Sequence, residues 1–288
     1  MNSNLKLAIQ RKGRLTAKSL ELLQHCGLDI EEYSERLVVT ASNFPLDILF
    51  LRDNDIPEYV QDGVADIGIA GENVVYEKQA KTIILEKLGF GKCSLLIAHP
   101  ENSELESIAE MNGKTIATTY PKILKDYLGK HKVEAKIIEL SGSVEIAPSL
   151  GVADLICDIV STGNTLMMNK LKKSFEVFKS EAVLLSSENL LKDLKKKEIL
   201  DGFLKRIRSV LKARNSKYLM MNVPKASLEK IIGLIPSLKS PTVVPLANPD
   251  LVAVHAVIPS NKFWQIIDDL KDAGASGILL MPIENMIL

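Results

Sequence analysis

Two segments of this chain have the same sequence pattern: a short amphipathic stretch is followed by a glycine and then by an apolar run. In the first, residues 56–60 lead into GVADIGI at 63–69, and in the second, residues 144–150 lead into GVADLI at 151–156. We interpret each as a helix, a glycine stop and a strand that is covered on both faces. Such strands belong to parallel-rich sheets with helices on both sides, so the repeat predicts an α/β fold with two similar lobes.

Two further strand-helix units open these lobes. Residues 5–10 predict a strand that ends in a basic turn before a helix over 15–26, and residues 114–119 predict a strand that ends at Tyr120-Pro121 before a helix over 122–128. Ligands of α/β folds bind at the carboxyl ends of strands. The turns after both strands are therefore candidate binding sites.

The C-terminal part has a different pattern. A charged amphipathic helix is predicted within 186–217, and after it the elements follow in the order strand, helix, strand, strand, helix, strand from Tyr218 to Met281. That order predicts a small ferredoxin-like βαββαβ domain.

Composition excludes several classes of protein. Lysine plus arginine number 36 and aspartate plus glutamate number 36, so no net charge favours nucleic acid or an anionic membrane. No apolar stretch approaches the length of a membrane span. The three cysteines, Cys26, Cys93 and Cys157, are odd in number and far apart, which predicts buried thiols in a reducing, cytoplasmic compartment. The histidines do not have metal-ligand spacing.

The most informative stretch is DIVSTGNTL at 158–166. An apolar strand ends at a turn rich in hydroxyl groups, which could hold a phosphate or could be an ordinary turn before a helix. By pattern alone the two readings are equal. The carboxylate of Asp158, placed just before the turn, favours a phosphorylated sugar, because it can accept hydrogen bonds from ribose hydroxyls or hold magnesium.

The residues around this turn resemble the signature of a known enzyme family. Spacing typical of the ATP phosphoribosyltransferase signature is found at Glu145, Gly151, Ala153, Ile156, Asp158, Ile159, Thr162, Gly163, Thr165 and Leu166. The segments LAIQRKGRL, RDNDIP, DGVADIGIAGENV, GKTIATTYP, GSVEIAP and SKYLMMNVP also resemble, in order, the long form of that family. The likeness covers essentially the whole chain.

The resemblance implies a two-lobed periplasmic-binding-protein-like catalytic core and a C-terminal regulatory domain. It places catalytic lobe I at 1–98 with 184–214, the phosphoribosyl-binding lobe II at 99–183 and the histidine-binding domain at 215–288. The implied reaction transfers the phosphoribosyl group of phosphoribosyl pyrophosphate to N1 of ATP with release of pyrophosphate, the first step of L-histidine biosynthesis. It needs Mg²⁺ and no protein nucleophile, since positioning and charge stabilisation would supply the catalysis.

The resemblance also implies which residues bind the substrates. Phosphoribosyl pyrophosphate would be bound by Glu145, Asp158, Ser161, Thr162, Gly163, Asn164 and Thr165. ATP and pyrophosphate would be bound by Lys12, Arg14, Arg52, Asp66, Gly71, Glu72 and Tyr120. Core capping or packing explains Asp66, Gly71, Glu72 and Tyr120 about as well. Glu145 and Asp158 are the candidate metal ligands, although Cys157 stands where type I phosphoribosyltransferases have a second acid.

Feedback control by histidine is implied in the C-terminal domain. The matching positions are Asn222, Leu238, Thr242, Val257, Ala275 and Gly277. Asn222 replaces an acidic residue of some members, so its amide would attract the ammonium group of histidine less strongly. The family also implies a homo-hexamer that exchanges with dimers.

Two other classes of function fit parts of the sequence. A solute-binding receptor would also have two α/β lobes, although the sequence begins with no export signal. A regulatory paralogue would keep the fold without the chemistry, but it would be expected to have lost Asp158, Thr162, Thr165, Lys12 or Arg14. Turnover of ATP and phosphoribosyl pyrophosphate separates the three.

Overall fold

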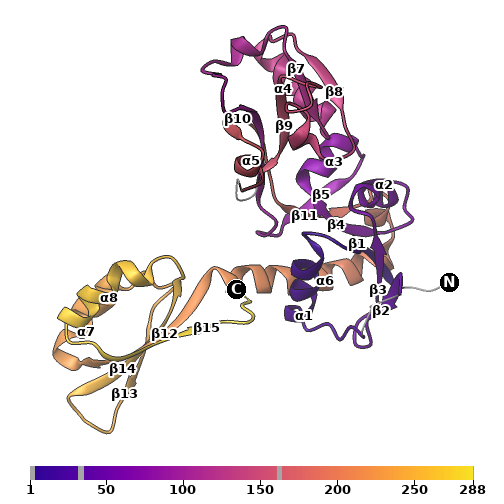
Figure 1. The fold of residues 1–288 in the computed structure, drawn as a ribbon. Coiled ribbons are helices and arrows are strands. Elements are labelled where there is room, and N and C mark those ends of the chain that lie inside the picture. Colours follow the sequence, from indigo (N-terminus) through magenta and orange to yellow (C-terminus); the bar gives the residue numbers. More distant parts are fainter. Residues whose placement is uncertain (1–3, 32–35, 161–163, 288) are drawn as a thin grey trace. The chain divides into compact units, whose positions relative to one another are not determined.

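The computed structural model describes residues 4–31, 36–160 and 164–287, with its elements labelled in Figure 1. The chain divides into two compact units. Unit 1 comprises Met1–Leu20 and Asp29–Ile199, and unit 2 comprises Glu21–Leu28 and Leu200–Leu288. Among the described residues, no helix is both long and apolar enough to span a membrane.

The first sheet of unit 1, sheet A, has six strands in the order β2-β3-β1-β4-β11-β5. Their bounds are β1 (Leu5–Gln10), β2 (Val38–Thr40), β3 (Leu46–Leu51), β4 (Ile67–Gly71), β5 (Ile83–Lys87) and β11 (Ala182–Ser186). Strand β1 is parallel to β3 and β4, whereas β2 and β11 run antiparallel to their neighbours. The predicted strand at 5–10 is confirmed. Every residue of β4 is buried, as expected for a strand covered on both faces.

The second sheet of unit 1, sheet B, has five strands in the order β10-β6-β9-β7-β8. Their bounds are β6 (Cys93–Pro100), β7 (Thr115–Thr118), β8 (Lys136–Glu139), β9 (Leu155–Val160) and β10 (Leu171–Ser180). Strands β7, β8 and β9 are parallel, and β6 is antiparallel to both of its neighbours. The helices of unit 1 are α1 (Thr16–His25, completed in unit 2), α2 (Ile56–Gln61), α3 (Glu72–Lys78), α4 (Pro121–His131) and α5 (Asn164–Met168).

Two crossovers join the sheets of unit 1. The chain leaves sheet A after β5, enters sheet B at β6, and returns to sheet A from β10 to β11 (Figure 1). The two crossovers are hydrogen-bonded to each other: Leu88 N–H donates to the Ala182 carbonyl, and Ala182 N–H donates to the Phe90 carbonyl, both at 2.9 Å. This discontinuous, two-lobed α/β arrangement confirms the predicted class of catalytic core.

One helix prediction is wrong. Residues 144–150 form only a short 3₁₀ turn, η3 (Val144–Ile146), and not the amphipathic helix that the repeat suggested. Ser143 has a left-handed backbone with φ of 51°, and Pro148 lacks the N–H that a continuing helix would need. The echo at 56–60 is helical, since α2 covers it.

Unit 2 begins with the long helix α6 (Leu194–Arg214), whose first six residues belong to unit 1. Its buried side includes Leu200, Phe203, Ile207 and Val210, which have the spacing expected of an amphipathic helix. The guanidinium of Arg206 donates a 3.0 Å hydrogen bond to the carbonyl of Cys26. The charged stretch therefore forms a packed helix, as predicted.

The C-terminal domain follows as β12 (Ser216–Pro224), α7 (Leu228–Leu234), β13 (Thr242–Pro245), β14 (Leu251–Pro259), α8 (Phe263–Asp272) and β15 (Ser276–Pro282). These strands form the antiparallel sheet C in the order β13-β14-β12-β15. Leu219, Met221 and Val223 pack in a core with residues of α7 and α8. The predicted ferredoxin-like βαββαβ order is confirmed.

The core of this domain gives a direct stability test. Ile231 on α7 is fully buried, whereas the adjacent Ile232 is 37% exposed. We expect Ile231→Ala to lower the free energy of unfolding of unit 2 by about 2–5 kcal/mol, because it removes buried methyl groups and leaves a cavity. Ile232→Ala, the matched control, is expected to change it by less than about 1 kcal/mol. Urea denaturation followed by the fluorescence of Trp264 measures both, and equal losses would contradict this packing.

Candidate active site

Basic residues gather at one edge of sheet A. Strands β1 and β3 are parallel neighbours, so their carboxyl ends place the turn of Lys12 and Arg14 beside Arg52. The side chain of Gln10 folds into the first turn and accepts a 2.9 Å hydrogen bond from the N–H of Leu15. Gly13 makes this possible, because its φ is +144° and a Cβ there would lie 2.4 Å from the Gln10 amide nitrogen. All three cations have exposed side chains.

Two carboxylates lie close together on sheet B. Asp158 is on the central strand β9 and Glu145 is on η3, and both are half-buried. Burial raises the pKa of the Asp158 carboxyl, and the negative charge of Glu145 raises it further, while a hydrogen bond from the N–H of Ile159 at 2.7 Å opposes the rise. The structure thus brings these two predicted residues together.

The pKa of Tyr120 is shifted by charged groups that belong to both sheets. Tyr120 is the residue before helix α4, and its N–H donates to the Thr118 hydroxyl at 2.9 Å. Burial is the main cause that raises the pKa of Tyr120 to about 12, and the charges of Asp158 and then Asp53 add to the rise, while Arg14 lowers it. Asp53 and Arg14 belong to sheet A, whereas Asp158 belongs to sheet B.

A direct contact also joins these groups. The guanidinium of Arg14 donates to the sulfur of Cys93 at 3.4 Å. Cys93 begins β6 and is only partly buried, so the prediction that all three cysteines are core thiols is wrong for it. Cys26 and Cys157 are buried, and burial raises the pKa of both thiols. Arg14, Cys93, Tyr120 and Asp158 therefore surround one place.

The sequence reading missed Asp53 in this group. Burial raises its pKa, Arg14 lowers it, and its buried Oδ1 has no hydrogen-bond partner among the described residues. The available signal was its position: it directly follows Arg52, just after β3, whose neighbour β1 leads into the turn that contains Arg14. An acid at the carboxyl end of a parallel strand belongs with the candidate site.

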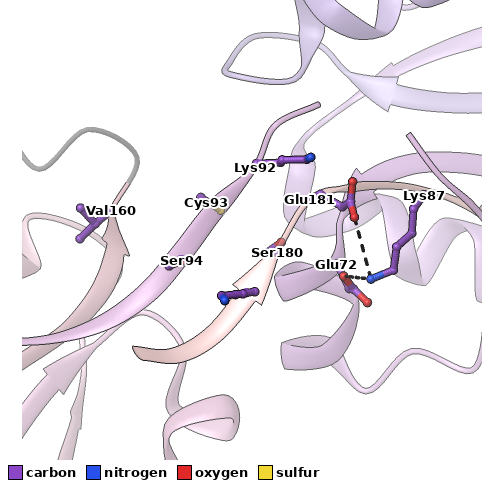
Figure 2. A pocket seen from close by; sticks show the side chains of 9 residues that line it. Glu72, Lys87, Lys92, Cys93, Ser94, Val160, Ser180 and Glu181 are labelled. Atoms are coloured by element: carbon purple, nitrogen blue, oxygen red, sulfur yellow. Dashed lines mark hydrogen bonds and ion pairs between the residues drawn. The ribbon is translucent and has the colours of Figure 1, made fainter. Parts of the chain in front are cut away.

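A pocket of about 450 Å³ lies beside the crossovers. Its lining residues are Glu72, Lys87, Lys92, Cys93, Ser94, Val160, Lys179, Ser180 and Glu181. Figure 2 shows Lys87 between two carboxylates, with its Nζ 3.0 Å from Glu72 and 4.0 Å from Glu181. The neighbouring Gly71 has no room for a side chain, because a Cβ there would lie 2.4 Å from the Asn73 amide oxygen.

Asp66 lies apart from this group. It precedes the amino end of β4, opposite to the edge that carries the cations, and only 6% of it is exposed. Its carboxylate accepts a 2.9 Å hydrogen bond from the N–H of Lys6. It also forms an ion pair with the ammonium of Lys196 at 2.8 Å. Of the two readings of Asp66, ligand binding and packing, its surroundings favour packing.

The turn that the sequence singled out lies partly outside the described residues. Ser161, Thr162 and Gly163 lie outside the described residues, and Asn164 and Thr165 are described as the start of the backbone of α5. Across the described parts of the chain, no three histidine, cysteine or acidic side chains come together as a metal-binding group.

The predicted histidine-binding residues fall into two groups on sheet C. Asn222 pairs with Ser276, beside Ala275 and Gly277. In the other group, Leu238 N–H donates to the Val257 carbonyl at 2.9 Å, and Thr242 pairs with His255. Val257 pairs with Tyr218, four residues from Asn222, so the groups lie about 13 Å apart along β12. The structure does not bring all six together within one chain.

The two-lobed α/β core carries Asp158 and Glu145 in one lobe and the exposed cations Lys12, Arg14 and Arg52 in the other. The family model "ATP phosphoribosyltransferase" matches residues 52–209, and the model for the C-terminal domain of the same family matches residues 213–285. The chain therefore belongs to the ATP phosphoribosyltransferase family, in the long form that carries its own C-terminal domain. Its enzymes join ATP to phosphoribosyl pyrophosphate in the first step of histidine biosynthesis.

Relatives of this chain agree over its whole length. It is 48% identical to an ATP phosphoribosyltransferase of Cytophaga hutchinsonii, with 100% of both chains covered, and 46% identical to one of Bacteroides thetaiotaomicron, with 99% of this chain and 100% of that one covered. Among solved structures, the ATP phosphoribosyl transferase (HisG:HisZ) complex from Thermotoga maritima matches with a TM-score of 0.60 and 30% identity, covering 71% of this chain and 98% of that chain.

The role of Asp66 can be tested through its partner. Lys196→Met keeps the aliphatic stem but leaves the buried carboxylate without its cation, so we expect a loss of roughly 2 kcal/mol in the free energy of unfolding, less than for a fully buried pair because 26% of the Lys196 side chain is exposed. KM for ATP should stay within twofold. Lys195→Met, at an exposed neighbouring position, is the control. A large rise in KM for ATP with unchanged stability would instead place Asp66 at the ATP site.

Proposed function

We propose that phosphoribosyl transfer to N1 of ATP takes place near Tyr120, whose pKa is shifted both by Arg14 of sheet A and by Asp158 of sheet B. This convergence is the observation that carries the proposal. A cationic strand edge can receive pyrophosphate, and an acidic strand end opposite it can receive ribose, so a bond between ribose and pyrophosphate would lie between the two.

In the proposed site, Asp158 and Glu145 accept hydrogen bonds from the ribose hydroxyls. Residues 161–165 hold the 5-phosphate with their N–H and hydroxyl groups. Lys12, Arg14 and Arg52 face the pyrophosphate and the triphosphate of ATP. Gly71, Glu72 and Tyr120 border the nucleotide, and Asp66 supports the sheet from its other end.

The carboxylates also fit a magnesium ion. Mg²⁺ prefers oxygen ligands and is usually held by one or two carboxylates together with substrate phosphates. Asp158 and Glu145 are such a pair, since the charge of Glu145 adds to the raised pKa of Asp158 and a bound cation would offset that repulsion. A bound Mg²⁺ would neutralise charge on the departing pyrophosphate.

Catalysis on this proposal needs no protein nucleophile. N1 of adenine attacks C1 of the ribosyl group while the bond to pyrophosphate breaks, so the protein has to align two anionic substrates and stabilise the leaving group. Alignment alone can supply about 7–11 kcal/mol of the reduction in the barrier. The three cations of the two turns after β1 and β3 supply the electrostatic part.

The reaction is tested by mixing the protein with ATP, phosphoribosyl pyrophosphate and Mg²⁺, removing pyrophosphate with a pyrophosphatase and following the absorbance of the adenine adduct. We expect turnover that depends on both substrates. Tight ligand binding without turnover would contradict the proposal and favour the receptor or paralogue reading.

Asp158→Asn gives a second prediction with two opposite effects. We expect kcat to fall at least about 100-fold, because a group that stabilises developing charge is lost. The raised pKa of Asp158 means that its ionisation costs stability as pH rises through that pKa, so the variant should have a higher Tm than the wild type at pH 8. Glu139→Gln, at the exposed end of β8 in the same sheet, is the control. An unchanged kcat in Asp158→Asn would refute the assignment of Asp158.

For regulation, we propose that L-histidine binds to sheet C and inhibits the enzyme. The two groups of predicted residues, about 13 Å apart along β12, support a pocket that is completed by a second copy of the chain. A homo-hexamer in exchange with dimers would supply such copies. We also propose a cytoplasmic location, in agreement with the three free cysteines.

Asn222 allows the histidine proposal to be tested by a gain of affinity. Asn222→Asp would pair a carboxylate with the ammonium group of histidine, and we expect the inhibition constant to fall about tenfold, since charged hydrogen bonds exceed neutral ones by about 1–1.5 kcal/mol. Asn261→Asp adds the same charge at an exposed position of the same domain and should have no effect. Equal shifts in both variants would contradict a site at Asn222.

A further inference from the structure

Helix α4 lacks a capping side chain of its own. It begins at Pro121, and its N-cap position is occupied by Tyr120, which makes no side-chain capping hydrogen bond. Serine, threonine, aspartate or asparagine would usually satisfy the first amides of a helix at this position. The amides at the start of α4 must therefore find an acceptor elsewhere.

The acceptor is Glu77, which belongs to a helix connected to sheet A. Glu77 lies in the last turn of α3, the helix that follows β4 of sheet A. Its Oε1 accepts from the N–H of Lys122 at 2.8 Å, and its Oε2 accepts from the N–H of Ile123 at 3.0 Å. A carboxylate is favourable at this end of a helix, because it makes charge-assisted hydrogen bonds and meets the positive end of the helix dipole. Glu77 thus caps α4 across the two lobes.

One other hydrogen bond joins the same two helices, but farther from the turn. The hydroxyl of Tyr76 donates to Asp126 at 2.9 Å, and Asp126 is also bonded to the ammonium of Lys122 within α4. The ring of Tyr76 packs against Phe178 of β10, with centroids 5.3 Å apart. The Tyr76–Asp126 bond reaches the second turn of α4, whereas Glu77 reaches the two amides that directly follow Tyr120 and Pro121.

The position of Glu77 connects it to the proposed site. Burial is the main cause that raises the pKa of the Cys157 thiol, and the charges of Asp158 and Glu77 both add to it. Both carboxylates therefore lie near the same side chain of β9. A shift in the start of α4 would move Tyr120 relative to Asp158, which stays on β9.

We propose that Glu77 is a positioning residue for the nucleotide: by capping α4 from the opposite lobe, it holds the Tyr120 turn beside Asp158. This inference rests on the proposed function, in which Tyr120 borders ATP. In that proposed function, phosphoribosyl pyrophosphate is bound by Asp158, Glu145 and residues 161–165, none of which belongs to α4. Loss of the cap should therefore affect ATP more than the sugar substrate.

The test compares Glu77→Gln with Tyr76→Phe in the full-length protein. Glutamine keeps the size of the side chain but has a single oxygen acceptor and no charge, so it cannot cap both amides. We expect KM for ATP to rise about tenfold, equivalent to about 1.4 kcal/mol, while KM for phosphoribosyl pyrophosphate stays within twofold. Tyr76→Phe removes a bond between the same helices and leaves the cap in place, so both KM values should stay within twofold.

Hydrogen exchange gives a readout that does not depend on activity. The amides of Lys122 and Ile123 should exchange at least about tenfold faster in Glu77→Gln than in the wild type, and at the wild-type rate in Tyr76→Phe. A purely structural role would lower the amount of active protein, and hence kcat, without changing KM for ATP alone. If the wild type shows no turnover, the proposed function fails, whereas exchange still reports whether the cap exists. Unchanged exchange, an unchanged KM for ATP or an equal effect of Tyr76→Phe overturns the positioning role.

Discussion

The catalytic unit depends on the way the chain crosses twice between sheets A and B. Because the crossovers at 88–92 and around residue 181 are hydrogen-bonded to each other, each sheet keeps its own core while the strand ends of both contribute to one place. Sheet A contributes Arg14, Arg52 and Asp53, and sheet B contributes Tyr120 and Asp158.

Burial then gives the site its electrostatic character. Asp158, Asp53 and Tyr120 are all partly withdrawn from water, and burial is the first cause of the raised pKa of each. An acid whose charge is poorly solvated gains more from a cation or a donor hydroxyl than one on the surface does. At the two carboxylates, Asp158 and Asp53, the protein accepts some loss of stability, and bound substrates with Mg²⁺ would recover it.

Much of the fold could be predicted from residue patterns. The strand at 5–10, the helix α2 and the βαββαβ order of the C-terminal domain follow from apolar periodicity, which depends only on neighbours in sequence. The helix predicted at 144–150 failed because Pro148 and the left-handed Ser143 interrupt a pattern that is otherwise helical. For the candidate site, the family resemblance singled out Asp158, Glu145 and Tyr120, which the structure groups electrostatically, together with Asp66, whose partner Lys196 is 130 residues away. It could not find Asp53 as part of the group or Glu77 as the cap of α4.

The sequence by itself determined the family, the three sheets and the residue types needed for phosphoribosyl transfer, because local hydrophobic order and motif spacing are written along the chain. Only the tertiary structure decided which charged groups meet. It paired Arg14 with Cys93 and placed Asp66 against Lys196 at the far end of its strand. It also supplied the cap of α4 from a helix in the other lobe. These contacts depend on the direction of strands and the path of the crossovers, which bring together residues that share no local pattern.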